Sequence, residues 1–170
     1  MRQGLTRPIW VVAPSKGTSM ELMHFAYGPT EAGQAMPSIT ISAPPEKVWA
    51  AITEPELRKK WFFGVDTETD WQPGSPIVHR GEWEGKPYED KGEIKIFEPG
   101  RRLMHTHWSS MSGRPDSPEN YETVTYSLTE MNGATEVGIT EDNVAGDEQK
   151  AKSDEMWKAA LAELKKVAEE

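Results

Sequence analysis

The stretch SAPPEKVWAAITEPELRKKW, residues 42–61, decides the fold because it begins two short helices with proline directly after a strand. Proline suits the first position of a helix, where its missing N–H would have no partner, and it pushes the preceding residue towards extended geometry. Pro45 and Pro55 are each predicted to start a helix on this ground. The one-turn spacing of Val48 and Ile52 gives the first helix an apolar face.

The second helix carries a capping signal and a short apolar face. Thr53 and Glu56 have the spacing of a capping box, in which each side chain bonds the other residue's backbone N–H. Leu57 and Trp61 lie one turn apart and are expected to face the core. The three basic residues between them are expected to face water: Arg58, Lys59 and Lys60.

On both sides of these helices the apolar residues alternate with polar ones, which is typical of half-buried strands. Turn signals such as Pro73-Gly74, Pro99-Gly100 and Asn132-Gly133 separate the alternating segments, so mostly antiparallel pairing is expected. The predicted strands are residues 38–43, 65–71, 77–83, 93–97, 103–108, 124–128 and 135–139.

A long amphipathic helix is predicted at the C-terminus after an acidic connection, residues 141–152. Ser153 is the expected N-cap, and acidic residues follow it in the first turn. The apolar stripe consists of Trp157, Ala160, Leu161, Leu164 and Ala168. Such a stripe must lie on an apolar surface, and the strands provide one. The fold class is therefore α+β, with a sheet of six to seven strands, two short helices after the first strand, and a final helix packed on the sheet.

This order resembles the START-like helix-grip superfamily, also called SRPBCC. More specifically, the chain is similar to the group homologous to the C-terminal domain of the activator of heat-shock protein 90 ATPase. The matching segments are APPEKVWAAI at 43–52, TEPEL at 53–57, Trp61-Phe62, Pro73-Gly74, Gly92-Glu93-Ile94, EPGRRL at 98–103, and Trp157 with Leu161, Leu164 and Lys165. The similarity spans about residues 37–168, so we expect one helix-grip domain over residues 37–170.

The resemblance implies a curved sheet that grips the last helix, with a cavity between them. Members of the superfamily bind lipids, hormones, polyketides or chaperone partners, so the fold by itself does not settle function. The chain departs from the expected pattern at Met156, where glycine is expected, and at His105 and His107, where large aromatics are commoner. The histidines are expected to make the cavity more polar.

Composition excludes several classes of protein. The chain has 170 residues, with 19 Lys and Arg against 28 Asp and Glu, giving a net charge of −9. This charge argues against binding to duplex nucleic acid or to anionic lipid. No apolar run approaches the ~20 residues that span a bilayer. Cysteine is absent, which excludes disulfides and thiolate sites and fits a cytoplasmic protein. Residues 1–36 lack a clear period and are expected to be a flexible extension, with a short strand possible at residues 9–13.

The histidines are the side chains with the most chemistry to offer. His105 and His107 share one face of their strand with Leu103, and alternation alone leaves open whether that face is the inner one. If it is, His79 can join them. Three histidines and a carboxylate can bind zinc, but no carboxylate has convincing spacing, so no metal and no cofactor are expected. Acid–base catalysis by these histidines with Tyr126 is a chemical alternative.

The leading hypothesis is a non-catalytic protein that binds a small hydrophobic molecule between the sheet and the last helix. The residues expected to line the cavity are Trp61, Ile77, His79, Trp83, Leu103, His105, His107, Tyr126, Trp157 and Leu161. Aromatic residues at these periods are also common in a plain core. Two alternatives are a chaperone-linked or stress-response interaction module and a cyclase-like enzyme that uses the histidines.

Overall fold

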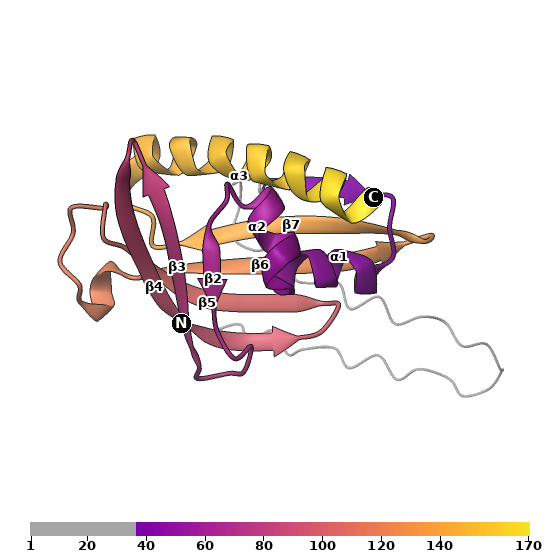
Figure 1. Ribbon diagram of the computed structural model, residues 1–170, viewed down its shortest axis with the longest axis horizontal. Coiled ribbons are helices and arrows are strands. Elements are labelled where there is room, and N and C mark those ends of the chain that lie inside the picture. The colour runs from indigo at the N-terminus through magenta and orange to yellow at the C-terminus, as the bar shows by residue number, and fades with distance from the viewer. Residues whose placement is uncertain (1–36) are drawn as a thin grey trace, which may run out of the picture. The chain divides into compact units, whose positions relative to one another are not determined.

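One long helix crosses the face of a seven-stranded antiparallel sheet (Figure 1). The computed structural model describes residues 37–170; the predicted extension at 1–36 lies outside the described residues. The elements are β1 Ser38–Ile41, α1 Pro45–Thr53, α2 Pro55–Trp61, β2 Asp66–Glu68, β3 Pro76–Trp83, β4 Lys86–Glu98, β5 Arg102–Ser109, a 3₁₀ turn at Pro118–Asn120, β6 Glu122–Met131, β7 Ala134–Asp142 and α3 Gly146–Glu169. The α+β class and the helix-grip arrangement are confirmed.

The sheet order is β1-β7-β6-β5-β4-β3-β2, and every neighbouring pair is antiparallel. Directly opposite residues in such pairs point to the same face. Leu103 of β5 lies opposite Tyr126 of β6, and His105 lies between Ile94 of β4 and Val124 of β6. All five are buried, so the histidine face of β5 is the inner face that the sequence left open.

Proline starts both short helices as predicted, but the predicted capping box is wrong. Pro45 is the first residue of α1, and Pro55 is the first residue of α2. The N-cap of α2 is Glu54, with no side-chain cap bond. The Thr53 hydroxyl instead donates to the carbonyl of Trp49, one turn back in α1. Because α1 runs through Thr53, that residue is helical and cannot take the extended N-cap geometry.

The last helix begins earlier than predicted. α3 starts at Gly146, so residues 146–152, more than half of the expected connection at 141–152, are helical, and Ser153 lies inside the helix. Asp147 and Glu148 occupy its first turn, where negative charge is favourable. The Ser153 hydroxyl donates to the Glu141 carboxylate of β7 rather than capping the helix. None of the described helices is both long and apolar enough to cross a membrane.

The predicted strand at residues 65–71 is mostly irregular. Only Asp66–Glu68 pairs with β3, and Trp71 adopts a positive φ of 55°. Alternation is therefore not sufficient evidence for a strand here, because the partner strand accepts only three residues of this segment.

The core lies between α3 and the inner face of the sheet, with α1 and α2 closing one end. The buried stripe of α3 is the predicted one: Trp157, Ala160, Leu161, Leu164 and Ala168. Two polar contacts fix the C-terminal end of α3 on β1 and on the residue after it. Lys165 donates to the carbonyl of Thr40, and the Glu169 carboxylate accepts from the Ser42 backbone N–H, each at 2.7 Å.

Gly92 marks a close approach between β4 and β5. A Cβ placed there would lie 1.7 Å from the carbonyl oxygen of Thr106, a backbone atom that cannot turn aside. The register of this pair shifts between Ile94 and Ile96, which is the signature of a β-bulge. Gly92 therefore lets the two strands stay paired where β5 carries its histidines.

Replacing Gly92 by alanine is expected to lower the free energy of unfolding by about 1–3 kcal/mol or more, because β5 must move to relieve the overlap. Urea melts measure the change. Gly85→Ala is the control, since nothing lies within 4 Å of its added methyl group and only its positive φ is strained. Equal losses of unfolding free energy in the two variants would contradict the close approach of β4 and β5 at Gly92.

Trp157→Ala is expected to destabilise the domain by about 3–5 kcal/mol, the usual range for truncating a buried tryptophan. Trp157 is 4% exposed, whereas its neighbour Met156 is 39% exposed, so Met156→Ala is the matched control. Chemical denaturation would refute this packing if Trp157→Ala lost less than about 1 kcal/mol.

Candidate functional site

A cavity of about 140 Å³ lies between the N-terminal half of α3, the end of α2 and the inner face of the sheet. Phe63 and Met156 stand at its exposed side, with 56% and 39% of their surfaces accessible. The lining residues are Arg58, Phe62, Phe63, Val65, His79, Tyr88, Asp90, His105, His107, Val124, Tyr126, Glu141, Met156 and Trp157. Most of the exposed surface of the wall is apolar, although eight of the fourteen lining residues carry an ionisable group.

Half of the ten residues predicted for this cavity lie on its wall. These are His79, His105, His107, Tyr126 and Trp157. Four others are buried in the adjoining core without lining the cavity: Trp61, Ile77, Leu103 and Leu161. The tenth, Trp83, ends β3 beside the hairpin turn and is 60% exposed. Alternation assigns a residue to a face, but it does not say whether another element covers that face.

Arg58 was expected to face water, and this prediction is wrong. Only 1% of its surface is exposed, and it lines the cavity. Arg58 precedes Trp61 and Phe62 by three and four residues, so the helical period places it beside them. That spacing was the available signal. Hydropathy alone hides it, because charged residues are almost never fully buried without a partner.

The Arg58 guanidinium has three neutral hydrogen-bond partners. It donates to the Thr67 hydroxyl at 3.0 Å, to the Ile52 carbonyl at 3.0 Å and to the Tyr126 phenol at 3.4 Å. No carboxylate pairs with it within residues 37–170. Burying an unpaired charge costs several kcal/mol even after relaxation.

Aromatic rings compensate for part of that cost. The Arg58 guanidinium carbon lies 4.8 Å from the centre of the Phe62 ring, 5.3 Å from that of Trp61 and 5.8 Å from that of Tyr126. A desolvated cation–π contact contributes about 2 kcal/mol. The rings stabilise the cation without neutralising it, so a positive charge remains at the cavity wall.

His79 forms a hydrogen bond with Thr67. Its Nδ1 lies 3.0 Å from the Thr67 hydroxyl, which also accepts from Arg58. Burial, followed by the charge of Arg58, holds the pKa of His79 well below its usual value of 6.5. His79 is thus neutral at pH 7.

His105 is also neutral, and its hydrogen bond defines its tautomer. Its Nδ1 donates to the carbonyl of Thr106 at 3.0 Å, and burial lowers its pKa to about 3. Nε2 consequently carries a lone pair, and this buried atom has no hydrogen-bond partner. The indole Nε1 of Trp157 is likewise buried and unpartnered. Two residues that line the cavity therefore keep an unsatisfied ring nitrogen, an acceptor in His105 and a donor in Trp157.

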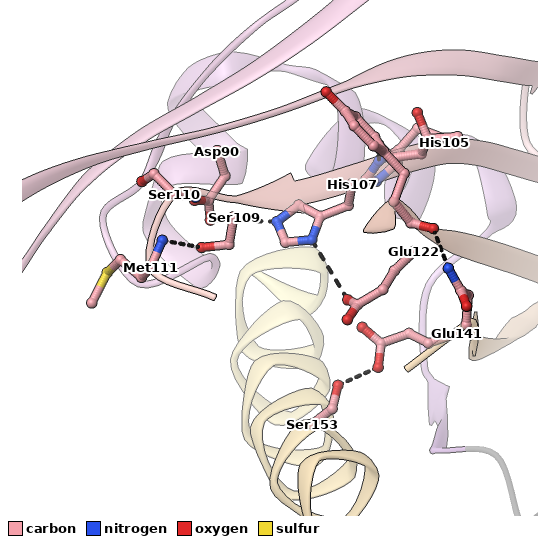
Figure 2. A network of polar contacts seen from close by, with 12 residues as sticks. Asp90, His105, His107, Ser109, Ser110, Met111, Glu122, Glu141 and Ser153 are labelled. Carbon is pink, nitrogen blue, oxygen red and sulfur yellow. Dashed lines mark hydrogen bonds and ion pairs between the residues drawn. The ribbon is translucent and has the colours of Figure 1, made fainter. Parts of the chain in front are cut away.

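His107 is charged at neutral pH, because it lies between two carboxylates (Figure 2). Its Nε2 is 3.3 Å from Asp90, and its Nδ1 is 3.8 Å from Glu122. Burial opposes the charged form, but the hydrogen bonds and charges of the carboxylates prevail and raise the pKa of His107 to about 9. At pH 7, therefore, His79 and His105 are neutral, whereas the adjacent His107 is positively charged.

The three imidazoles are close together although β4 separates their strands. The His79 ring centre lies 5.8 Å from that of His105 and 6.2 Å from that of His107. Gly92 is the inner-face position of β4 opposite Ile77, and it has no side chain to separate the rings. No group of three or more potential ligands within residues 37–170 is arranged to hold a metal ion.

Comparison with known proteins identifies the family. Residues 42–169 match the family described as Activator of Hsp90 ATPase homolog 1-like protein. The chain belongs to this family, which confirms the resemblance seen in the sequence. Membership fits a ligand-binding domain and does not specify the ligand. No curated protein matched the chain at a significant level.

Solved structures from bacteria share the fold. ChR145 from Cytophaga hutchinsonii is 41% identical, with a TM-score of 0.66 over 78% of this chain and 92% of that one. The Aha1 dimer from Colwellia psychrerythraea is 23% identical, with a TM-score of 0.61 over 78% and 92%. CalU16 from Micromonospora echinospora is 22% identical, with a TM-score of 0.62 over 77% and 73%. The last two establish likeness of fold alone.

The contact of His107 with its carboxylates predicts a pH dependence of stability. The folded pKa of about 9 lies above the usual value of 6.5 for histidine, so the folded state holds the proton more tightly. The contact of His107 with its carboxylates therefore stabilises the fold fully below pH 6.5. As pH rises through 9 this contribution is lost, which lowers the free energy of unfolding by about 1–3 kcal/mol. His79 and His105 have lowered pKa values and are neutral across this window.

Urea melts of the wild type and of His107→Gln at pH 6.5 and pH 9.5 measure this contribution. We expect the difference in stability between the two proteins to shrink at the higher pH. A difference that does not change with pH would show that the imidazolium is not held by Asp90 and Glu122.

Proposed function

We propose that this protein binds a small, largely hydrophobic molecule in the cavity beneath α3 and does not catalyse a reaction. One observation carries the proposal: a cavity of largely apolar surface is lined by His105 and Trp157, whose side chains each keep a buried ring nitrogen without a partner. Leaving a buried polar group unsatisfied costs about 1–3 kcal/mol. A ligand that supplies the missing partners would recover that energy and be oriented by it.

The dimensions of the cavity support a ligand of modest size. Its volume of about 140 Å³ is close to the ~150 Å³ of an apolar cavity known to accept benzene. Phe63 and Met156 present apolar surface at the exposed side, so part of a longer molecule would be able to extend past them.

The protonation states favour binding over the cyclase-like alternative. An efficient general acid or base has a pKa near the working pH. The pKa of His105 is about 3, and that of His107 is about 9. Both are suited to a fixed hydrogen-bonding role at neutral pH.

The family name supports a second candidate, a chaperone-linked interaction, because this chain matches an Activator of Hsp90 ATPase homolog 1-like family. A pull-down from cell extract at low salt, with the full chain as bait, tests it. Recovery of no chaperone would reject this candidate and leave the cavity proposal standing. The absence of cysteine supports a cytoplasmic location.

A cavity-filling variant tests ligand binding. Val124 lies on the inner wall, so Val124→Phe should occupy the space that the ligand needs. We expect lipophilic compounds that raise the Tm of the wild type by several degrees to leave the Tm of this variant unchanged. Thermal-shift screening provides the measurement, and mass spectrometry of molecules that co-purify with the native protein provides the first compounds.

Leu128→Phe is the matched control because Leu128 belongs to the same buried face of β6 but does not line the cavity. This variant should respond to ligand as the wild type does. Both variants must show a cooperative melt without ligand. A Val124→Phe protein that is stabilised as strongly as the wild type would place the ligand elsewhere.

A further inference from the structure

We infer that the ligand is a small carboxylic acid whose carboxylate pairs with Arg58 and whose apolar body, about the size of one aromatic ring, fills the cavity. This inference rests on the proposed binding function and specifies its chemistry. The inference has three grounds. The Arg58 guanidinium has no carboxylate partner, the Trp157 indole N–H is unsatisfied, and both residues line the cavity.

The charges around the cavity leave Arg58 without an anion. The two carboxylates on the wall have other partners: Asp90 accepts from His107, and Glu141 accepts from Ser153 (Figure 2). Glu122, which lies behind them, also faces His107. Arg58 meets only neutral acceptors and aromatic rings. Among the residues that the structure describes, no carboxylate forms an ion pair with Arg58.

Hydrogen-bond capacity also favours an anionic group. A guanidinium has five N–H groups, and Arg58 uses three of them. The remaining two N–H groups of Arg58 make no hydrogen bond among the described residues, and the Trp157 indole N–H has no acceptor. A carboxylate offers several lone pairs and binds arginine in two-pronged fashion, which makes it the natural complement.

These donors lie in one aromatic cluster. The Tyr126 ring centre is 5.8 Å from the Arg58 guanidinium, and it is 5.7 Å from the ring centre of Trp157. The Phe62 ring is 4.8 Å from the same guanidinium and lies stacked 5.9 Å from Trp157. The aromatic walls exclude water, so a charge pair formed there would be stronger than one on the surface.

His105 adds one further requirement on the same ligand. Its Nε2 is an acceptor, because Nδ1 donates to Thr106. A carboxylate cannot satisfy it, whereas a hydroxyl on the ligand can. The ring of His105 lies 6.1 Å from that of Tyr126, so both requirements fall within the span of one small molecule. A hydroxylated aromatic acid meets them together.

Calorimetric titration with benzoate and with its neutral counterpart benzyl alcohol tests the inference. At pH 7 the wild type is expected to bind benzoate at least about tenfold more tightly, since a hydrogen bond to a charged group corresponds to a ~10–100-fold change in affinity. Arg58→Met should lower the affinity for benzoate by about the same factor and leave the affinity for benzyl alcohol nearly unchanged. At least one hydroxybenzoate isomer should bind to the wild type more tightly than benzoate does.

Lys60→Met is the matched control, because it removes a cation from the same helix at an exposed position. It should bind benzoate as the wild type does; a loss equal to that in Arg58→Met would indicate a general effect of charge and overturn the inference. If Arg58→Met fails to fold, the comparison of the two ligands on the wild type decides, and Arg58→Lys, which keeps the charge, should retain the preference.

The outcomes separate this inference from the proposed function. If benzyl alcohol binds as tightly as benzoate, the inferred carboxylate is wrong, and the proposal that the cavity binds hydrophobic molecules still stands. If benzoate binds with the expected preference but no hydroxybenzoate binds more tightly, only the inferred hydroxyl is wrong. Failure of every compound to bind would reject both the inference and the proposed function at this cavity size.

Discussion

The packing of α3 on the inner face of the sheet is the constraint on which the rest of the structure depends. Trp157, Leu161 and Leu164 form the stripe that covers the sheet, and without it the inner face would be exposed to water. Polar contacts hold both halves of the helix: Ser153 in the N-terminal half bonds β7, and Lys165 near the C-terminus bonds β1. The helix is thereby fixed across the strands, and the space left near its N-terminal half becomes the cavity.

Burial in that space changes the chemistry of the polar side chains. His105 and His107 are two residues apart on one strand, yet burial lowers the pKa of the first while two carboxylates raise that of the second. Arg58 remains a cation among aromatic rings. The outcome is a small space of largely apolar surface whose wall holds two cations, Arg58 and His107, and two carboxylates, Asp90 and Glu141, which is the character of a binding site.

The fold was largely predictable because it follows from local signals. Alternation gave the strands, Pro45 and Pro55 gave the helix starts, and the period of the Trp157 stripe gave the buried face of α3. Errors occurred where a tertiary partner overrides a local preference. Thr53 and Ser153 are good caps in isolation, but the first is absorbed into α1 and the second binds Glu141 across the fold.

The candidate site was only half predictable. Counting along the strands placed His105 and His107 on one face, but it left open whether that face is the inner one. Trp83 has the same parity as His79 but is 60% exposed at the end of β3, and Arg58 was expected to face water because of its charge. The sequence by itself determined the class of fold, its family and which residues of a strand share a face. Only the tertiary structure decided which of them border empty space and which protons they hold, because burial and charge at a site depend on segments far apart in the chain.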